Sequence, residues 1–140
     1  MPNPIITDYD TMSLTVWNAE YRDVRLHHSG AITYPGGQVL AFDGANGNWK
    51  ATDSTTATVA NAKAVLFAET EFTGSEVGGI KRVRAVIGGK VDAGQLVFEG
   101  SDTLDTIPTP AADADSFRVQ LRGYGIIAED LAQQQIQDNQ

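Results

Sequence analysis

The sequence predicts a small, compact, mostly β domain with an extended N-terminal arm and at most one or two short helices. Its 140 residues fit a single domain. Glycine is abundant, at 14 residues, and Thr and Val are frequent, which favours strands joined by turns. Short apolar runs alternate with Gly-rich turn sequences along the body of the chain, and that arrangement is typical of β proteins.

Residues 1–20 are expected to form the arm. Pro2 and Pro4 disfavour helix and favour extended backbone. Met12, Leu14 and Val16 then recur at every second position, which is a strand pattern. An extended, partly apolar terminus either frames the domain's own sheet or adds a strand to a partner.

The body of the domain is predicted to be a series of short strands separated by turns. In the first strand Val24 and Leu26 share one face, and in a later strand Val83, Ala85 and Ile87 point inward. The expected strands cover residues 20–28, 37–42, 63–69, 80–87 and 94–98. The expected turns are Pro35-Gly36-Gly37, Asn46-Gly47-Asn48, Gly78-Gly79 and Gly88-Gly89.

The C-terminal region begins with a polar, Pro-containing connection at residues 101–116. Residues 113–122 fit either a strand or a helix, and we favour a short helix capped by Asp113 or Asp115 and ended by Gly123. A strand at Ile126 and Ile127 follows. The polar tail, residues 129–140, has little to bury.

Composition and charge exclude several classes of function. The chain has no cysteine, so it has no disulfide, thiolate metal site or Cys nucleophile. A net charge of −8 argues against nucleic-acid binding, and Lys81–Arg84 fits a solvated strand face. No apolar run approaches the length of a membrane span, about 20 residues, and the N-terminus does not resemble a signal peptide.

The Gly-rich stretch PGGQVLAFDGANGNW (35–49) suggests a phosphate-binding loop at first sight. Neither the P-loop string nor the dinucleotide pattern G-x-G-x-x-G is present, so a turn leading into a strand is the better interpretation. Residues 43–48, DGANGN, lack EF-hand spacing, and a local Asx-turn is expected there instead of a calcium loop. Asp8 and Asp10 could touch a cation, but they lie in the arm.

The remaining candidates for chemistry have simpler structural explanations. His27 and His28 are adjacent, so on a strand one packs inward and the other faces solvent, and they do not share a metal. The glutamates at 69 and 71 fit a solvated strand face better than an acid–base pair. Trp17 and Trp49 could stack on a sugar but are more typical of core or interface anchors. We therefore expect no catalytic residue, cofactor, metal or small-molecule substrate.

Several stretches together resemble the lambda-like bacteriophage head decoration (capsid cement) proteins over about residues 20–128. They are EYRDVRLHHSGAITYPGGQVLAFDGANGNWKATD, AKAVLFAE, VRAVIGGKVDAGQL and LRGYGIIA. The matching positions are Tyr21, Arg22, Val24, Gly30, Gly37, Val39, Leu40, Gly47, Trp49, Leu121, Gly125 and Ile126. The resemblance rests on turn and strand signatures and includes no catalytic motif.

The resemblance implies a β-clip or β-tulip-like domain at 21–128 between the arm, 1–20, and the tail, 129–140. Such a protein is made in the host cytoplasm and sits on the outer surface of the virion. It forms homotrimers at threefold and quasi-threefold positions of the expanded capsid, and its arm adds a strand to the major capsid protein. The arm residues expected to bind the capsid are Pro2, Pro4, Ile5, Ile6, Met12, Leu14, Val16 and Trp17.

Two other functions stay open on the sequence. One is a different β module of the virion, such as a tail or spike-base component. The other is a small trimeric β nucleotide hydrolase, which needs a metal-binding Asp and a substrate-pocket Tyr in recognisable motifs; we find neither motif.

Overall fold

The structure is a computed structural model that describes residues 13–109 and 115–130. The arm positions Pro2, Pro4, Ile5, Ile6 and Met12 therefore lie outside the described residues. The same holds for Asp8, Asp10 and Asp113, and for the tail beyond residue 130.

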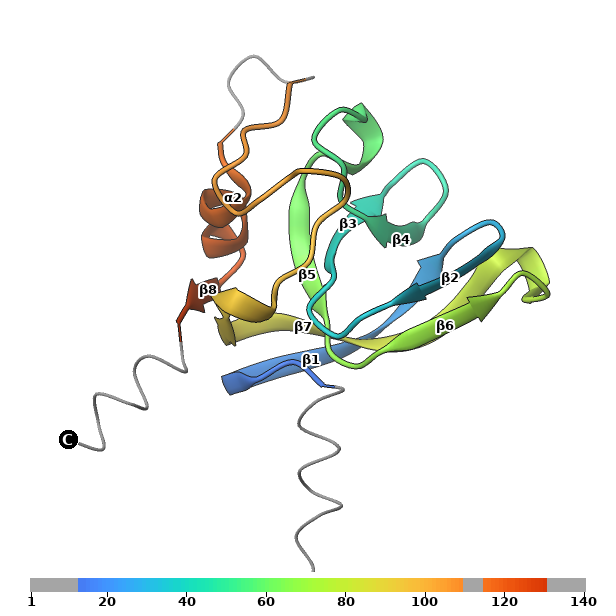
Figure 1. Cartoon of the computed structure of the whole chain (residues 1–140), viewed down its shortest axis with the longest axis horizontal. Helices are drawn as coiled ribbons and strands as arrows, with labels where there is room; N and C mark the ends of the chain where they lie inside the picture. The colour runs from blue at the N-terminus through green and yellow to red at the C-terminus, as the bar shows by residue number, and fades with distance from the viewer. Residues whose placement is uncertain (1–12, 110–114, 131–140) are drawn as a thin grey trace, which may run out of the picture.

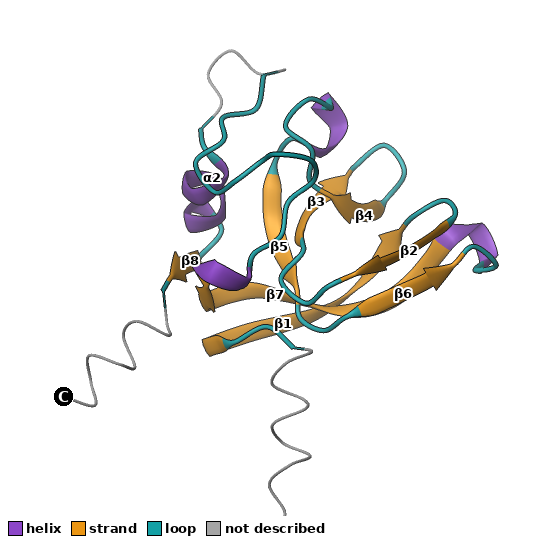
Figure 2. Ribbon diagram, viewed as in Figure 1, coloured by secondary structure: helices purple, strands orange, loops and turns teal. Residues whose placement is uncertain are grey.

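The protein is mostly β with one short α-helix in the described part of the chain, as the sequence predicts (Figure 2). Single 3-10 turns at Ala57–Val59, Val77–Gly79 and Ala93–Gln95 link some of the elements. The strands are β1 (Val16–His27), β2 (Ala31–Tyr34), β3 (Val39–Asp43), β4 (Asn48–Ala51), β5 (Ala62–Leu66), β6 (Thr70–Thr73), β7 (Ile80–Asp92) and β8 (Ile126–Glu129), and the helix is α2 (Phe117–Gly123).

Five of the strands close into a small barrel, in the order β1-β4-β3-β5-β7 and back to β1 (Figure 1). The long antiparallel pairing of β1 with β7 forms most of one wall. The seam between β1 and β4 is short, because these two strands meet only at Leu26 and Trp49, in parallel. Strand β8 extends the sheet from the other edge of β7.

A first core cluster lies among the barrel strands and the separate two-stranded ribbon of β2 and β6. Tyr34 and Phe72 of that ribbon pack with Val24, Leu26 and residues of the other strands. The aromatic rings of Tyr34 and Phe72 meet edge-on, with centroids 6.1 Å apart. The ribbon therefore covers apolar surface of the barrel strands.

A second core cluster lies under α2 and β8. Phe117 and Leu121 of the helix pack with Val39, Val65 and Val86 of three barrel strands. The neighbouring positions of those strands, such as Leu40 and Leu66, belong to the first cluster. Strands β3 and β5 are thus buried on both faces, which explains why their sequences are continuous apolar runs instead of alternating ones.

Strand β7 runs unbroken through Gly88 and Gly89, so the predicted turn at these glycines is wrong. A β-bulge in β1 lies opposite them, between Trp17 and Tyr21. Asn18 has φ +53° in this bulge, and Gly89 has φ +102°. The glycine pair serves a close approach of two backbones within the sheet.

Two other expectations differ from the structure. Residues 94–98 form a 3-10 turn and a single parallel bridge between Gln38 and Val97, not a strand, since only one rung of pairing is present. The helix cap is Ser116, whose Oγ accepts a hydrogen bond from the Val119 N–H, instead of Asp113 or Asp115. The helix ends at Gly123 and a strand begins at Ile126, as predicted.

The last residues assigned to the arm are integrated into the domain. Leu14 is 3% exposed and belongs to the second core cluster, with Val16 packed against it. The Leu14 N–H donates to the Phe67 carbonyl at 2.8 Å. Residues 16–20 form the first part of β1, in which Val16 and Ala19 are partly buried and pack against the same cluster. Trp17 is 57% exposed.

The β-bulge of β1 opposite Gly89 gives a direct test of backbone strain. A Cβ added at Gly89 would lie 2.5 Å from the Asn18 carbonyl oxygen and 2.7 Å from the Ala19 Cα. Gly30 has a similar φ of +97° but nothing within 4 Å of an added Cβ. We expect Gly30→Ala to cost about 1 kcal/mol from φ alone, and Gly89→Ala about 3 kcal/mol or more, in urea unfolding. Equal costs for the two variants would contradict this account.

Glu76 provides a pH-dependent contribution at the β6–β7 connection. The N–H groups of Thr73 and Gly74 donate to its carboxylate at 2.9 and 3.0 Å. The hydrogen bond from the Thr73 N–H is the largest cause that lowers the pKa of Glu76 from 4.5 to about 2. Because the folded-state pKa is depressed, the stabilisation is complete above pH 4.5 and is lost as the pH falls toward 2.

We therefore expect Glu76→Gln to lower the thermal unfolding midpoint at pH 7. The difference from the unchanged protein should shrink between pH 4.5 and 2. Glu71→Gln, an exposed change on β6, is the control and should track the unchanged protein at every pH. A gap that persists at pH 2 would show that the Glu76 contribution is not ionic.

Candidate functional site

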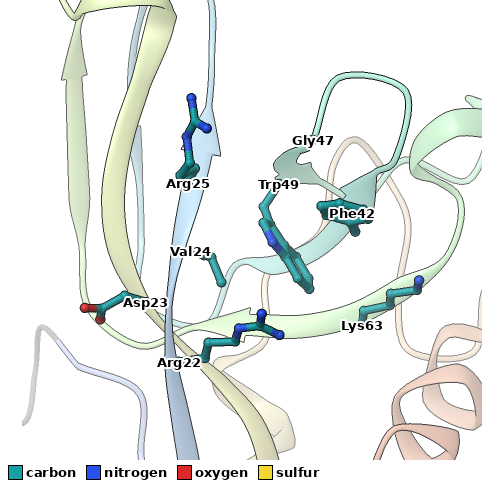
Figure 3. A pocket seen from close by; sticks show the side chains of 8 residues that line it. All are labelled: Arg22, Asp23, Val24, Arg25, Phe42, Gly47, Trp49 and Lys63. Carbon is teal, nitrogen blue, oxygen red and sulfur yellow. The ribbon is translucent and has the colours of Figure 1, made fainter.

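A pocket of about 450 Å³ opens beside β1 where that strand separates from β4 (Figure 3). This volume falls in the range of ligand pockets, which is about 300–1,000 Å³. Its lining comes from four barrel strands and the turn between β3 and β4. The residues that line it are Arg22, Asp23, Val24, Arg25, Phe42, Gly47, Trp49 and Lys63.

The pocket runs along the edge of β1 and not over one face of it. Alternate side chains of a strand point to opposite faces, so a cavity over one face would touch every second residue. This cavity is lined by the consecutive residues Arg22–Arg25. In the described part of the chain, β1 has a partner on this side only at Leu26, which pairs with Trp49. The edge of β1 is therefore open along the pocket.

An aromatic pair forms the opposite wall. Phe42 and Trp49 are directly paired across β3 and β4, with ring centroids 5.4 Å apart and planes tilted by 56°. Phe42 is 38% exposed and Trp49 is half-buried. Trp17 does not line the pocket, so the structure does not bring together the two tryptophans that a sugar platform would need.

Lys63 reaches the pocket because of a second bulge. Leu40 pairs with Ala64 and Ala41 pairs with Ala62, so Lys63 is the extra residue of β5. Bulges often re-aim a side chain beside a functional site. The Lys63 Nζ lies 6.0 Å from the centroid of the Phe42 ring and 5.4 Å from that of Tyr124.

Gln120 of α2 holds this bulge in place. Its Oε1 accepts a hydrogen bond from the Ala62 N–H at 2.6 Å. Its Nε2 donates to the carbonyls of Ala60 and Asp115 at 3.2 and 3.1 Å. The helix therefore fixes the backbone from which Lys63 projects.

The pocket is basic although the chain is acidic. Among the described residues, the ion pairs join other side chains and leave Arg22, Arg25 and Lys63 without a carboxylate partner. Arg25 also lies directly across from Arg82 of β7. Asp23 lines the pocket, but its carboxylate points away from Trp49 and Lys63 (Figure 3). The arrangement suits an anionic ligand.

The rim beside Gly47 is built by the predicted Asx-turn. Asp43 accepts hydrogen bonds from the Ala45 N–H at 3.2 Å and from the Asn46 side chain at 3.0 Å, and Lys50 pairs with it at 3.0 Å. The hydrogen bond from Asn46 is the largest cause that lowers the pKa of Asp43. The Asp43 carboxylate therefore has its partners within the β3–β4 hairpin itself.

A second pocket, of about 330 Å³, contains both histidines. His27 and His28 are both half-buried and line it together, so the expectation that one faces inward and one faces solvent is wrong, because β1 ends at His27. The Tyr34 hydroxyl lies 3.0 Å from the His28 Nδ1. Burial, with the charge of Glu99, raises the pKa of Tyr34 to about 12, which keeps this phenol protonated.

The other candidate chemical groups are not assembled into a site. Glu69 and Glu71 are exposed, and neither lines the two pockets described above. Within residues 13–109 and 115–130, no group of three or more His, Cys, Asp or Glu side chains is placed to hold a metal ion. No helix in these ranges is long and apolar enough to cross a membrane.

Comparison with known proteins gives no relative. No family model matches the chain, and neither a curated protein nor a solved structure matches it.

The role of Gln120 is testable through two variants. Gln120→Ala leaves the buried Ala62 N–H without an acceptor, so we expect it to lower the free energy of unfolding by about 2 kcal/mol. Gln120→Glu keeps that acceptor and loses the donors to Ala60 and Asp115, so a smaller loss is expected. Urea unfolding measures both, and an unchanged midpoint for Gln120→Ala would show that the bulge does not need the helix.

Proposed function

We propose that the chain is a structural virion protein that binds the outside of the expanded phage capsid and stabilises the shell. In this proposal it acts as a homotrimer at threefold and quasi-threefold sites, with an N-terminal arm that adds a strand to the major capsid protein. The proposal rests on the resemblance carried by residues 20–128. A small β barrel with exposed apolar positions is compatible with it.

The observation that best supports an arm is the way in which the chain enters the domain. Ser13 makes an isolated antiparallel bridge with Ala68, and the Thr15 carbonyl accepts from the Asp92 N–H at 3.0 Å. The backbone therefore enters in extended form and is fastened at its root. An extended segment that is bonded to the domain at this point supports an arm that adds a strand to a partner.

The division between arm and domain moves toward the N-terminus in this proposal. Leu14 and Val16 are committed to the chain's own core and cannot anchor a partner in this conformation. The contact with the capsid is then assigned to the earlier residues of the predicted set, which are Pro2, Pro4, Ile5, Ile6 and Met12. Trp17 stays accessible and can contribute from the domain surface.

An exposed row across the sheet offers a surface for the trimer or the shell. Trp17 pairs with Lys90, and Lys90 pairs with Ile127, so these three side chains share one face of β1, β7 and β8. Ile127 is 41% exposed. Trp17 and Ile127 are thus two exposed apolar side chains on one face of the sheet, one on each side of Lys90.

Co-sedimentation with capsid shells tests the proposal. The purified protein is mixed with unexpanded and with expanded shells of its own phage. Binding to expanded shells alone is expected, and analytical ultracentrifugation is expected to show trimers in solution. Binding to neither shell would reject decoration and favour a component of the tail or spike base, and turnover of nucleoside triphosphates would favour the hydrolase.

Deleting residues 2–12 should abolish binding to the capsid and leave the trimer and the unfolding midpoint unchanged. The deletion stops before Ser13 and so keeps the Ser13–Ala68 bridge and the buried Leu14. Deletion of residues 131–140 is the matched control at the other terminus and should leave capsid binding intact. Loss of trimers on deleting 2–12 would show that the segment serves the oligomer instead.

A further inference from the structure

We propose that the pocket beside β1 is a docking site for an extended, acidic segment of a protein partner, which pairs with the open edge of β1 as an added strand. This proposal does not depend on capsid decoration. It rests on the open strand edge, on the unpaired cations around it and on the aromatic wall that faces it.

The backbone of β1 supplies the first part of the recognition. Residues 22–25 line the pocket consecutively, and their partner strand β7 lies on the other edge. An open strand edge presents N–H and C=O groups in alternation, and an added peptide strand satisfies both kinds. A small anion would use the positive charge alone and would not pair with the carbonyls of the edge, which an added strand does. The geometry therefore favours a peptide.

The side chains supply the specificity for acidic residues. Arg22 shares a face of β1 with Val24, and Arg25 lies on the opposite face. An added strand would thus meet Arg22 on one face, and on the other face Arg25 together with the carboxylate of Asp23. Lys63, carried by its bulge, adds a third cation across the pocket from β1. None of the three has a carboxylate partner in the described part of the chain.

The aromatic wall supplies an apolar subsite. Val24 is buried at the floor of the pocket, and the Trp49 indole projects toward the space between β1 and β5 (Figure 3). Phe42 continues that wall outward. An extended segment places every second side chain on this side, so one large apolar residue between two acidic ones fits the pocket.

The site is tested with a nine-residue peptide that is blocked at both ends and carries a fluorophore. In the acidic peptide a central phenylalanine lies between two glutamates at every second position, so that all three share one face of the extended chain, and threonine fills the other positions; in the matched peptide lysine replaces glutamate. A third peptide keeps these residues but has proline in place of one of the threonines, which removes a backbone donor. Fluorescence anisotropy with the full-length protein should show binding of the acidic peptide, and binding of the other two should be at least tenfold weaker.

Two variants localise the site. The double variant Arg22→Glu with Lys63→Glu should weaken binding of the acidic peptide at least tenfold. Arg122→Glu, an exposed charge reversal on α2 outside the pocket lining, should leave the affinity within twofold. Circular dichroism checks that both variants fold. If the double variant does not fold, protection of the amides of residues 22–25 from hydrogen exchange on adding peptide to the unchanged protein decides the question.

The remaining outcomes overturn the proposal. Equal binding of the lysine peptide would show that charge does not select the ligand. Equal binding of the proline peptide would show that no strand forms. If free glutamate, inorganic phosphate or a short single-stranded DNA displaces the acidic peptide at similar concentration, the pocket is a general anion site. If no acidic peptide binds, or if residues 22–25 gain no protection, the edge of β1 is not a docking site.

Discussion

The antiparallel pairing of β1 with β7 is the constraint on which the rest of the structure depends. It extends from Val16 opposite Val91 to His27 opposite Ile80, nearly the whole length of both strands. The far edge of β7 then carries β5 and β8, and β8 brings α2 against the barrel. The pairing continues on both sides of the bulge at Asn18 and Gly89, which interrupts the register without ending either strand.

The candidate site follows from how the paired strands β1 and β7 meet the rest of the barrel. β1 pairs with β7 along nearly its whole length but with β4 at a single residue pair, which closes the seam. Beyond that pair the two strands diverge, and the open edge, the aromatic wall and the bulged Lys63 surround the space between them. The pocket is thus a product of the closure geometry of the barrel and not of a dedicated loop.

The sequence predicted the elements that depend on local pattern and missed those that depend on partners distant in the chain. The strands around Val24, Leu40, Leu66 and Val83 are present, because their apolar runs and turn residues are local signals. The sequence predicts a turn at Gly88 and Gly89, because nothing near them in sequence reveals the bulge of β1 across the sheet.

Residues 94–98 resemble residues 37–42 in sequence, yet only the latter have strands on both sides.

The residues of the candidate site also depend on partners that are distant in the chain. Trp49 could be singled out from its chemistry, but the sequence gives no sign that it faces Arg22. The bulge at Lys63 is equally hidden, since it is defined by pairing with β3 and by the Ala62 N–H bonded to Gln120, which is 58 residues away.

Arg22 and Arg25 on β1 have a second possible role, which is to protect the open edge from pairing; the aromatic wall argues against it. Charged side chains on an open strand edge discourage the edges of other molecules from pairing with it, and Arg22 and Arg25 would serve that purpose. Such protection works best when the neighbouring surface is polar. Here the edge is bordered by Trp49, the partly exposed Phe42 and the buried Val24, which makes the same edge attractive to an apolar side chain. The lining holds three cations, Arg22, Arg25 and Lys63, and one carboxylate, Asp23. This excess of positive charge beside an apolar wall favours acidic segments over basic ones, so the edge is selective and not simply closed.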